Sequence, residues 1–342
     1  MTTPSFPTTA DDLRLLQDKI DALRDPGTYA DRPSRVDAIQ THMAWVFLTD
    51  RYAYKLKKPV KYPFLDFSTV EARRLHCGEE LRLNRRLAKD VYLGVVPLTV
   101  DPSGGFHVGD SGDTVDWLVW MRRLPGDRML DRMIHDGTVR REDARDVGAV
   151  LADFYHRQPP IPISANEHRE RLHEDLVETR EDLRVHDHRV SVALIDTIAD
   201  RVLALLDRHR DVFGQRAEAG RIVEGHGDLR PEHVCVTRPP VVIDCIEFNR
   251  QWRVVDAVSD LAFLGLECRR LGADWIGQVA RGAYEKRTGD VAGPVIWAFY
   301  RAYHAYLRAK IALWHLNEPN VDDPRKWTSK ARDYLEWADH EL

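Results

Sequence analysis

A change of pattern near Pro125-Gly126 divides the chain into two dissimilar parts. Before this point short β-rich runs alternate with helical stretches, and after it long amphipathic helices follow one another, broken by one β-rich island at residues 221–248. The 342 residues are enough for two packed lobes. We therefore expect an α+β fold with a small β-rich N-lobe, residues 1–122, and a large helical C-lobe, residues 123–342.

The N-lobe is expected to combine helices with an antiparallel sheet. Ser68-Thr-Val-Glu71 has the form of a capping box and predicts a helix running toward Ala88. Apolar and turn-forming residues predict the other elements: a helix at 11–24, strands at 45–48 and 52–56, and a second hairpin with strands at 95–100 and 117–121 around a short middle strand. The C-lobe helices are expected near 142–157, 166–184, 189–212, 256–287, 293–316 and 323–340.

Composition argues against several classes of function. Fifty basic and fifty-five acidic residues are well mixed and give a net charge of -5, so no basic field for nucleic acid is expected. No apolar run approaches eighteen residues and the start of the chain lacks a secretory pattern, so we expect no membrane segment and a cytoplasmic location. The four cysteines share no CxxC spacing and are expected to be reduced thiols.

The β-rich island places polar residues where they can act together. Val234–Val236 and Val241–Ile243 are short apolar runs joined by Thr-Arg-Pro-Pro, which predicts an antiparallel hairpin. If Val236 pairs with Val241 in this hairpin, His233 lies opposite Asp244 on the neighbouring strand. Asp228 can then curl back toward both side chains. Two carboxylates and an imidazole suit a hard divalent cation beside a general base. Turn capping by Asp228 and His233 is the simpler alternative.

The segments HGDLRPEH (226–233) and VID (242–244) resemble the catalytic loop and the metal-binding strand end of the aminoglycoside phosphotransferase family. This family is protein-kinase-like, so the resemblance implies a bilobal kinase fold and ATP and Mg²⁺ as cofactors. It implies Asp228 as the catalytic base and Asp244 as the magnesium ligand. The similarity spans roughly residues 40 to 265.

Two positions near these motifs leave alternatives open. His233 stands where the family has Asn, and magnesium prefers oxygen ligands. His233 is expected to bind metal unusually, to contact phosphate by a hydrogen bond, or to leave the site with one well-held ion. Glu247 is a candidate for the missing metal carboxylate, with a surface glutamate or an ion-pairing glutamate as the alternative. Asp256 and Asp260 resemble the D-x-x-x-D stretch that braces the family's catalytic loop. We expect Asp260 to be architectural.

The resemblance also implies a lysine and a glutamate that clamp ATP phosphates. Lys55, in Ala53-Tyr-Lys55, is the preferred lysine, while Lys57 and then Lys58 remain alternatives. Glu80 is preferred to Glu79 as its partner.

The remaining nucleotide contacts are also taken from the resemblance. The segment 40–45 stands where protein kinases have a glycine-rich loop, and it contains no glycine, so backbone amides and the Thr41 hydroxyl are expected to meet the phosphates. The backbone of Trp120 and Met121 is expected to contact adenine.

The chain also resembles a bacterial branch of the family that is often fused to a P-loop ATPase. The branch shares the segments 41–42, 54–60, 226–233 and 243–248. No G-x-x-x-x-G-K-[ST] pattern occurs in this sequence, which predicts a kinase domain standing alone.

We expect transfer of the γ-phosphoryl group of ATP to a hydroxyl of a small molecule, such as a sugar, an amino sugar or an aminoglycoside-like compound. Arg230 is a candidate for assisting at the γ-phosphate or acceptor, with loop bracing as the alternative. Glu267 and Asp274 are candidates for binding a cationic acceptor. A protein kinase and a non-catalytic ATP-binding module are the alternative functions, although D-F-G and A-P-E elements are lacking.

Overall fold

The computed structural model describes residues 10–109, 112–185, 189–317 and 323–342. The chain forms two compact units, one comprising Met1–Arg128 with Val241–Gln251 and the other Met129–Pro240 with Trp252–Leu342. A single boundary along the sequence does not describe this division, because the return segment 241–251 packs with the first unit. The start of the chain, used above to exclude a secretory pattern, and residues 110–111 of the second predicted hairpin lie outside the described residues.

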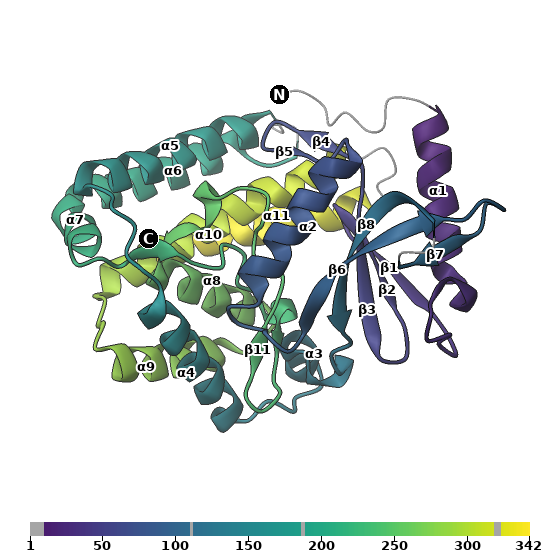
Figure 1. Ribbon diagram of the computed structural model, residues 1–342. Helices are drawn as coiled ribbons and strands as arrows, with labels where there is room; N and C mark the ends of the chain where they lie inside the picture. The colour runs from purple at the N-terminus through teal and green to yellow at the C-terminus, as the bar shows by residue number, and fades with distance from the viewer. Residues whose placement is uncertain (1–9, 110–111, 186–188, 318–322) are drawn as a thin grey trace. The chain divides into compact units, whose positions relative to one another are not determined.

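The first unit is built on a six-stranded sheet of order β1-β2-β3-β8-β6-β7, in which the strand pairs are antiparallel (Figure 1). Its strands and helices are α1 Ala10–Arg24, β1 Asp37–Gln40, β2 Ala44–Leu48, β3 Tyr52–Lys57, β4 Lys61–Tyr62, β5 Leu65–Asp66, α2 Val70–Asn84, β6 Tyr92–Val100, β7 Phe106–Val108, β8 Asp113–Arg122 and β11 Val241–Val242.

The β2–β3 hairpin forms as expected, with Leu48 paired to Ala53. Thr49 closes the turn because its hydroxyl accepts the backbone N–H of Tyr52 at 3.0 Å. Strand β1 was not predicted, since its sequence Asp-Ala-Ile-Gln lacks a β-rich run and its Ile39 is exposed.

Helix α2 carries Glu80, and its start differs from the prediction by one residue. Thr69 caps the helix by accepting the Ala72 N–H at 3.1 Å, while the Ser68 hydroxyl donates to Asp66 instead. The helix ends at Asn84, short of the predicted Ala88.

Asp116 on β8 fixes both helices of this unit against the sheet. Its carboxylate is buried and accepts Lys19 of α1 at 2.8 Å and two guanidinium nitrogens of Arg73 of α2, each at 2.8 Å. The bidentate Arg73 pair sets the position of α2, and with it the position of Glu80 along the sheet.

The second unit is mainly helical, as predicted. Its elements are α3 Leu130–His135, α4 Arg141–Arg157, α5 Ala165–Arg184, α6 Val192–Arg208, α7 Arg210–Glu218, β9 Ile222–Glu224, β10 Val234–Cys235, β12 Val254–Asp256, α8 Ala257–Arg270, α9 Asp274–Thr288, α10 Pro294–Trp314 and α11 Pro324–Glu341. Short 3-10 turns also occur in this unit, among them Pro231–His233 and His315–Asn317.

Two of the predicted C-lobe helices are each divided in the structure. The stretch predicted at 256–287 forms α8 and α9, because Gly272 takes a φ of 81° that ends the first helix. The stretch predicted at 189–212 forms α6 and α7, which meet at His209. Helix α3 was missed because it has only six residues.

Helix α10 forms the centre of the second unit and packs against α5, α8 and α11. Trp297, Tyr300 and His304 of this helix are all buried. Along the described parts of the chain, no helix has both the length and the apolar character needed to cross a bilayer.

Candidate functional site

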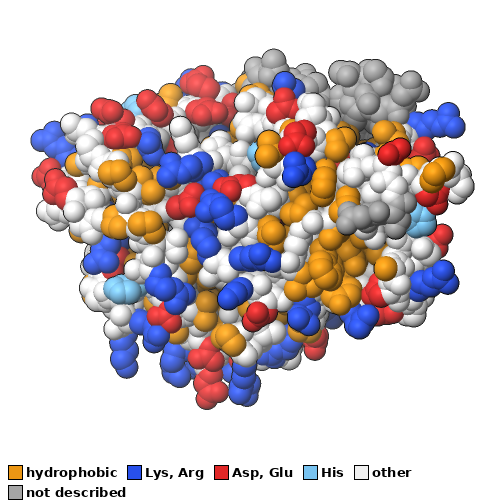
Figure 2. Space-filling model, in the orientation of Figure 1, with side chains coloured by type: hydrophobic (Ala, Val, Ile, Leu, Met, Phe, Trp, Pro, Cys, Tyr) orange, Lys and Arg blue, Asp and Glu red, His pale blue; other side chains and the backbone are white. Residues whose placement is uncertain are grey.

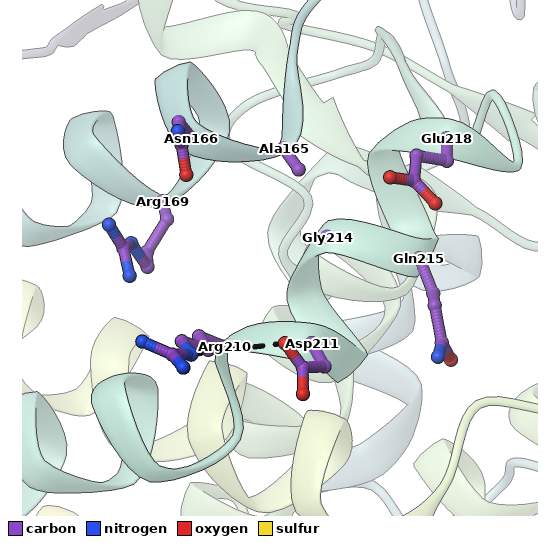
Figure 3. Close-up of a pocket in the computed structure, with 8 residues that line it drawn as sticks. All are labelled: Ala165, Asn166, Arg169, Arg210, Asp211, Gly214, Gln215 and Glu218. Carbon is purple, nitrogen blue, oxygen red and sulfur yellow. Dashed lines mark ion pairs between the residues drawn. The ribbon is translucent and has the colours of Figure 1, made fainter.

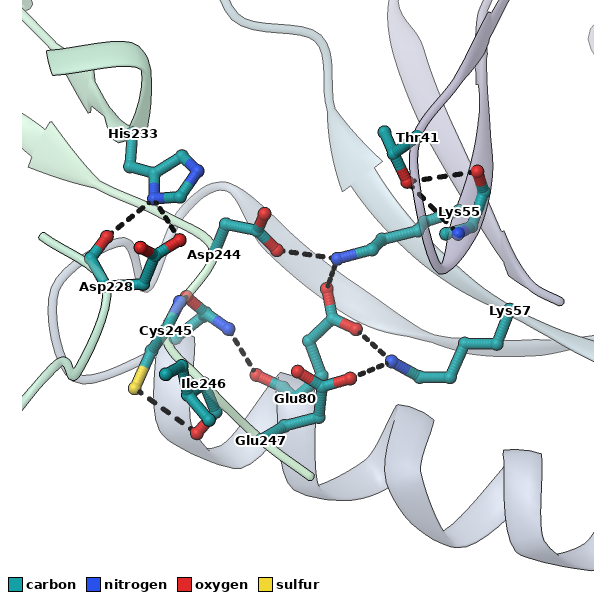
Figure 4. A network of polar contacts seen from close by, with 12 residues as sticks. Thr41, Lys55, Lys57, Glu80, Asp228, His233, Asp244, Cys245, Ile246 and Glu247 are labelled. Carbon is teal, nitrogen blue, oxygen red and sulfur yellow. Dashed lines mark hydrogen bonds and ion pairs between the residues drawn. The ribbon is translucent and has the colours of Figure 1, made fainter. Parts of the chain in front are cut away.

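The first unit brings two lysines of β3 to one glutamate of α2 (Figure 4). Lys55 and Lys57 are two residues apart and therefore point to the same face of the sheet. Lys55 Nζ lies 2.8 Å from Oε1 of Glu80, and Lys57 Nζ lies 2.6 Å from Oε2. Glu79 instead forms an ion pair with Arg82 on the outer side of the helix. Glu80 is thus the glutamate that meets the sheet lysines.

Asp244 follows β11 in the return segment and faces Lys55. Its Oδ1 lies 2.6 Å from Lys55 Nζ, and its side chain is 42% exposed. The backbone of Asp244 has a φ of 62°, a conformation that costs free energy for a residue other than glycine and is common at functional sites. Backbone contacts help to hold it, since the Asp244 N–H donates to Tyr92 Oη at 3.2 Å and the Cys245 N–H donates to Asn84 Oδ1 at 2.9 Å.

Glu247, the second carboxylate of the return segment, forms a short ion pair with Lys57. Lys57 is 1% exposed and Glu247 is 8% exposed, measured on the side chains. The two lysines therefore have different surroundings: Lys55 joins Glu80 to the accessible Asp244, whereas Lys57 joins Glu80 to the buried Glu247.

Charge pairing sets the protonation of this cluster. Burial alone would lower the pKa of Lys55, but the carboxylates of Asp244 and Glu80 raise it well above its ordinary value. Burial raises the pKa of Glu247, which Lys57 only partly offsets. For Glu80 burial is outweighed by Lys55 and Lys57, so its pKa is lowered. Lys55 accordingly holds a full positive charge beside an accessible carboxylate.

In the second unit, Asp260 at the start of α8 holds the loop that carries Asp228. Its Oδ2 accepts the His226 N–H at 2.7 Å and the Tyr155 hydroxyl at 2.7 Å, and its Oδ1 accepts the Gly227 N–H at 3.0 Å. Gly227 has a φ of 83°, which favours glycine at this position. The bracing position inferred for Asp260 thus coincides with direct contacts to the loop backbone.

Asp228 lies within a small polar group on this loop. Arg230 Nε is 2.9 Å from Asp228 Oδ1, and a second guanidinium nitrogen is 2.6 Å from Glu232. Burial would raise the pKa of Asp228, but Arg230, His233 and further cations lower it below the ordinary aspartate value. Asp228 is therefore an ionised carboxylate at neutral pH.

Both ring nitrogens of His233 contact groups of the same loop. Nδ1 lies 2.8 Å from the Asp228 carbonyl oxygen and Nε2 lies 3.2 Å from Arg230. With Nδ1 donating to the carbonyl, Nε2 is the acceptor that faces the guanidinium. His233 is thus joined through both ring nitrogens to the groups around Asp228.

Thr41 lies in the turn between β1 and β2, where its hydroxyl accepts the Ala44 N–H at 3.0 Å. Trp120 and Met121 lie in β8, paired with Tyr54 and Ala53 of β3 on one side. On the other side β6 pairs with the same residues. Their backbone groups thus belong to the sheet, and the first residues outside it follow Arg122.

The acidic residues near Lys55 can be compared with the ligands that the Mg²⁺ ion implied by the resemblance would need. Among the described residues no three His, Cys, Asp or Glu side chains gather as a metal-binding group. Mg²⁺ bound with a nucleotide needs only one or two protein carboxylates, because phosphate oxygens and water complete its coordination. Asp244, an accessible carboxylate, fits this requirement, whereas Glu247 is engaged by Lys57.

A separate pocket of about 480 Å³ lies on the second unit between α5 and α7 (Figure 3). It contains none of the residues singled out from the sequence and is lined by Ala165, Asn166, Arg169, Arg210, Asp211, Gly214, Gln215 and Glu218. On the face of the molecule in Figure 2, basic and acidic side chains are interspersed, consistent with the mixed composition.

Sequence reasoning missed the second ion pair, Lys57 with Glu247, and the amide of Asn84 that holds the return segment. The available signal was the spacing of Lys55 and Lys57, which places both lysines on one side of the strand.

Comparison with known proteins agrees with the two-unit architecture. The Phosphotransferase enzyme family, APH, matches residues 67–303. Choline kinase from Cryptosporidium parvum has a similar structure, with a TM-score of 0.56 and 12% identity over 95% of each chain. The AMP-bound spectinomycin phosphotransferase APH(9)-Ia gives a TM-score of 0.53 with 12% identity over 94% of this chain and 97% of the other. The fold is therefore protein-kinase-like, as predicted.

The chain belongs to the APH phosphotransferase enzyme family. It is 34% identical over 287 residues to the uncharacterized protein Rv2004c of Mycobacterium tuberculosis and to the uncharacterized protein Mb2027c of Mycobacterium bovis. In both cases the similarity covers 81% of this chain and 54% of the relative, so the chain spans about half the length of the curated relatives it matches.

Proposed function

We propose that this protein is an ATP-dependent phosphotransferase that phosphorylates a hydroxyl group of a small molecule. The observation that carries the proposal is the contact of Lys55 with both Glu80 and Asp244, at 2.8 and 2.6 Å. A charged lysine fixed by a helix glutamate beside an accessible aspartate is the arrangement that kinases use at ATP phosphates. Membership of the phosphotransferase family supports the same reaction class.

The first unit would hold the nucleotide. Lys55 would pair with phosphate oxygens in place of Asp244, and Glu80 would keep the lysine in position. Asp244 would hold Mg²⁺, which neutralises charge on the phosphates when it is bound. We propose Thr41 and the turn amides around it as further phosphate contacts. Because Trp120 and Met121 are paired within the sheet, backbone contact with adenine would fall to residues just beyond Arg122.

The second unit would supply the base. Asp228 accepts the proton of the acceptor hydroxyl as its oxygen bonds to the γ-phosphorus, and the bond from that phosphorus to the β–γ bridging oxygen breaks. The products are ADP, the phosphate ester and one proton. Asp228 is ionised and its loop is held by Asp260, so the carboxylate is ready to orient the nucleophile.

The neighbouring residues would support Asp228. Arg230 touches Asp228 directly and is proposed to orient it and to face the incoming phosphoryl group. His233, with both nitrogens in the loop, is proposed to position Asp228 in place of a metal-binding role. Glu247 is proposed to fix Lys57. We place the enzyme in the cytoplasm, where ATP is available.

The proposal is tested by ADP release from magnesium-ATP across a panel of sugars, amino sugars and aminoglycosides. Acceptor-dependent release that Asp228→Asn abolishes would support it. Failure of the wild-type protein to bind ATP would refute it, and ATP binding without any turnover would favour the alternative of a nucleotide-binding module.

A further inference from the structure

Basic side chains outnumber their acidic partners where helices α8, α10 and α11 of the second unit pack together. Glu267 of α8 is fully buried there and accepts the Tyr334 hydroxyl and Arg270 Nε, the latter at 2.8 Å. Arg308 of α10 lies 3.7 Å from Glu267, and Lys330 Nζ of α11 lies 6.0 Å from the ring centre of Tyr334. We call Arg270, Arg308 and Lys330 the cationic cluster; Glu267 pairs with the two arginines, and Glu232 adds a second negative charge near Arg270.

Arg308 and Lys330 are the members of the cluster that have donor groups or charge still available to bind an anion. The Arg308 side chain is 12% exposed, and its Nε is buried without a hydrogen-bond partner among the described residues. Lys330 is half-buried and makes no ion pair with any described residue, and its amino group lies 5.4 Å from the ring centre of Trp327. Burial and the charges of Arg308 and Arg270 lower the pKa of Lys330 to about 8. A partly buried cation whose charge or hydrogen-bonding groups are incompletely satisfied costs free energy, which a bound anion would offset.

The cationic cluster lies on the same helix face as the residue that holds the catalytic loop. Asp260 and Glu267 are seven residues, or two turns, apart on α8, so they share one face and are separated by roughly 10 Å along the axis. Asp260 binds the Gly227 N–H next to Asp228. Arg308 is also among the cations that act on Asp228. Arg230, which contacts Asp228, is likewise among the charges that act on Lys330, so Asp228 and the cluster belong to the same region of the second unit.

We propose that the acceptor carries an anionic group, a phosphate or a carboxylate, which Arg308 and Lys330 bind. This inference rests on the proposed function for the assignment of Asp228, and it defines the class of acceptor that the same site takes. Arginine forms paired hydrogen bonds with the oxygens of either group, and a lysine beside it adds a point charge.

A cationic acceptor of the aminoglycoside kind does not fit this part of the unit. Glu267, one of the two acidic residues considered from the sequence, is buried and already engaged by Tyr334 and Arg270. Asp274, the other, is exposed at the start of α9 and accepts Gln278. Bringing an ammonium group to the three cations of this cluster would add repulsion.

The first test measures binding of inorganic phosphate by calorimetry, with saturating magnesium-ADP present to fill the nucleotide site. Wild type is expected to bind, and Arg308→Gln and Lys330→Gln each to weaken binding about tenfold, the effect of losing one charge-assisted hydrogen bond. Lys326→Gln is the matched control, since Lys326 is an exposed lysine of the same helix, and Arg308→Lys is expected to retain most of the affinity. Absence of phosphate binding, or an equal loss in Lys326→Gln, overturns the inference.

The second test compares turnover of glucose, glucose 6-phosphate, gluconate and glucosamine, which differ mainly in charge. Preference for the phosphate or the carboxylate member, lost in Arg308→Gln, supports the inference and names the group. Preference for glucosamine that Arg308→Gln leaves unchanged overturns it while the proposed function stands. If no compound turns over but phosphate binding depends on Arg308 and Lys330, the anion site is supported and the proposed function is the part that fails.

Discussion

Lys55 and Asp244 are 189 positions apart in the sequence, and their side chains meet with Nζ and Oδ1 2.6 Å apart. The contact depends on the φ of 62° at Asp244 and on Tyr92 and Asn84, which hold the return segment against α2 and β6. In the proposed function this cation and this accessible carboxylate would bind phosphate and magnesium, and the protein holds them in place before either arrives.

Replacement of Lys55 by Met tests the phosphate role. The substitution removes the charge that faces Asp244, so we expect kcat/KM for ATP to fall by about 100-fold or more, the scale of losing one preorganised electrostatic contact. Lys61→Met is the control, because Lys61 is exposed on β4 and pairs with Asp66. Steady-state kinetics of both variants check the prediction, and equal effects would count against Lys55.

Lys57 is expected to matter for stability more than for nucleotide binding. It is 1% exposed and joins Glu80 to Glu247, so Lys57→Met leaves two buried carboxylates without this partner. Loss of one member of a buried pair costs about 3 to 5 kcal/mol of unfolding free energy. Urea denaturation measures this, and the double variant Lys57→Met with Glu247→Gln should recover part of the loss. No change in unfolding free energy would contradict the structural role.

Asp260 is expected to act through the loop that it holds. Asp260→Ala leaves the N–H groups of His226 and Gly227 without their carboxylate partner, which costs about 1 to 3 kcal/mol for each donor. We predict a strong fall in kcat with little change in nucleotide affinity, measured by calorimetry with ADP. Tyr155→Phe removes only one of the contacts and should have a smaller effect. Weakened ADP binding with unchanged kcat would contradict this assignment.

The buried His304 side chain is expected to make the free energy of unfolding depend on pH. Burial lowers its pKa to about 3, and its ring stacks on Phe263 with centroids 4.5 Å apart. The histidine stays neutral in the folded protein but takes up a proton when unfolded, so stability is intact above pH 6.5 and falls as the pH drops toward 3. The loss should approach about 4 to 5 kcal/mol.

The variant His304→Asn isolates this contribution. It will be less stable at neutral pH because the stacking is lost, but its unfolding free energy should fall less steeply between pH 6.5 and 3. Denaturation curves at several pH values check this, and parallel slopes for the two proteins would contradict it.

Much of the fold and part of the candidate site followed from local patterns. The β2–β3 hairpin and the long helices were predictable because apolar spacing and turn residues are local signals. Lys55 and Glu80 were chosen from a resemblance, and the structure brings them together. Element ends were less predictable, as the shift from Ser68 to Thr69 shows, since adjacent hydroxyl residues compete for the same cap.

Other features depend on contacts that a linear pattern does not encode. The pairing of Lys57 with Glu247 joins residues 190 positions apart. The cationic cluster assembles side chains from three helices that the sequence separates by some sixty positions, from Arg270 to Lys330. A lysine or arginine in an amphipathic helix is usually solvated, so its burial beside other cations became visible only from packing.

The most direct test of the account compares ADP release by wild type and Asp228→Asn in the presence of magnesium-ATP and a phosphorylated acceptor, with ADP affinity measured for both. The account predicts acceptor-dependent turnover in the wild type, at least about 1,000-fold less in the variant, and similar ADP affinity. Turnover that survives in Asp228→Asn would contradict the assignment of Asp228 as the base.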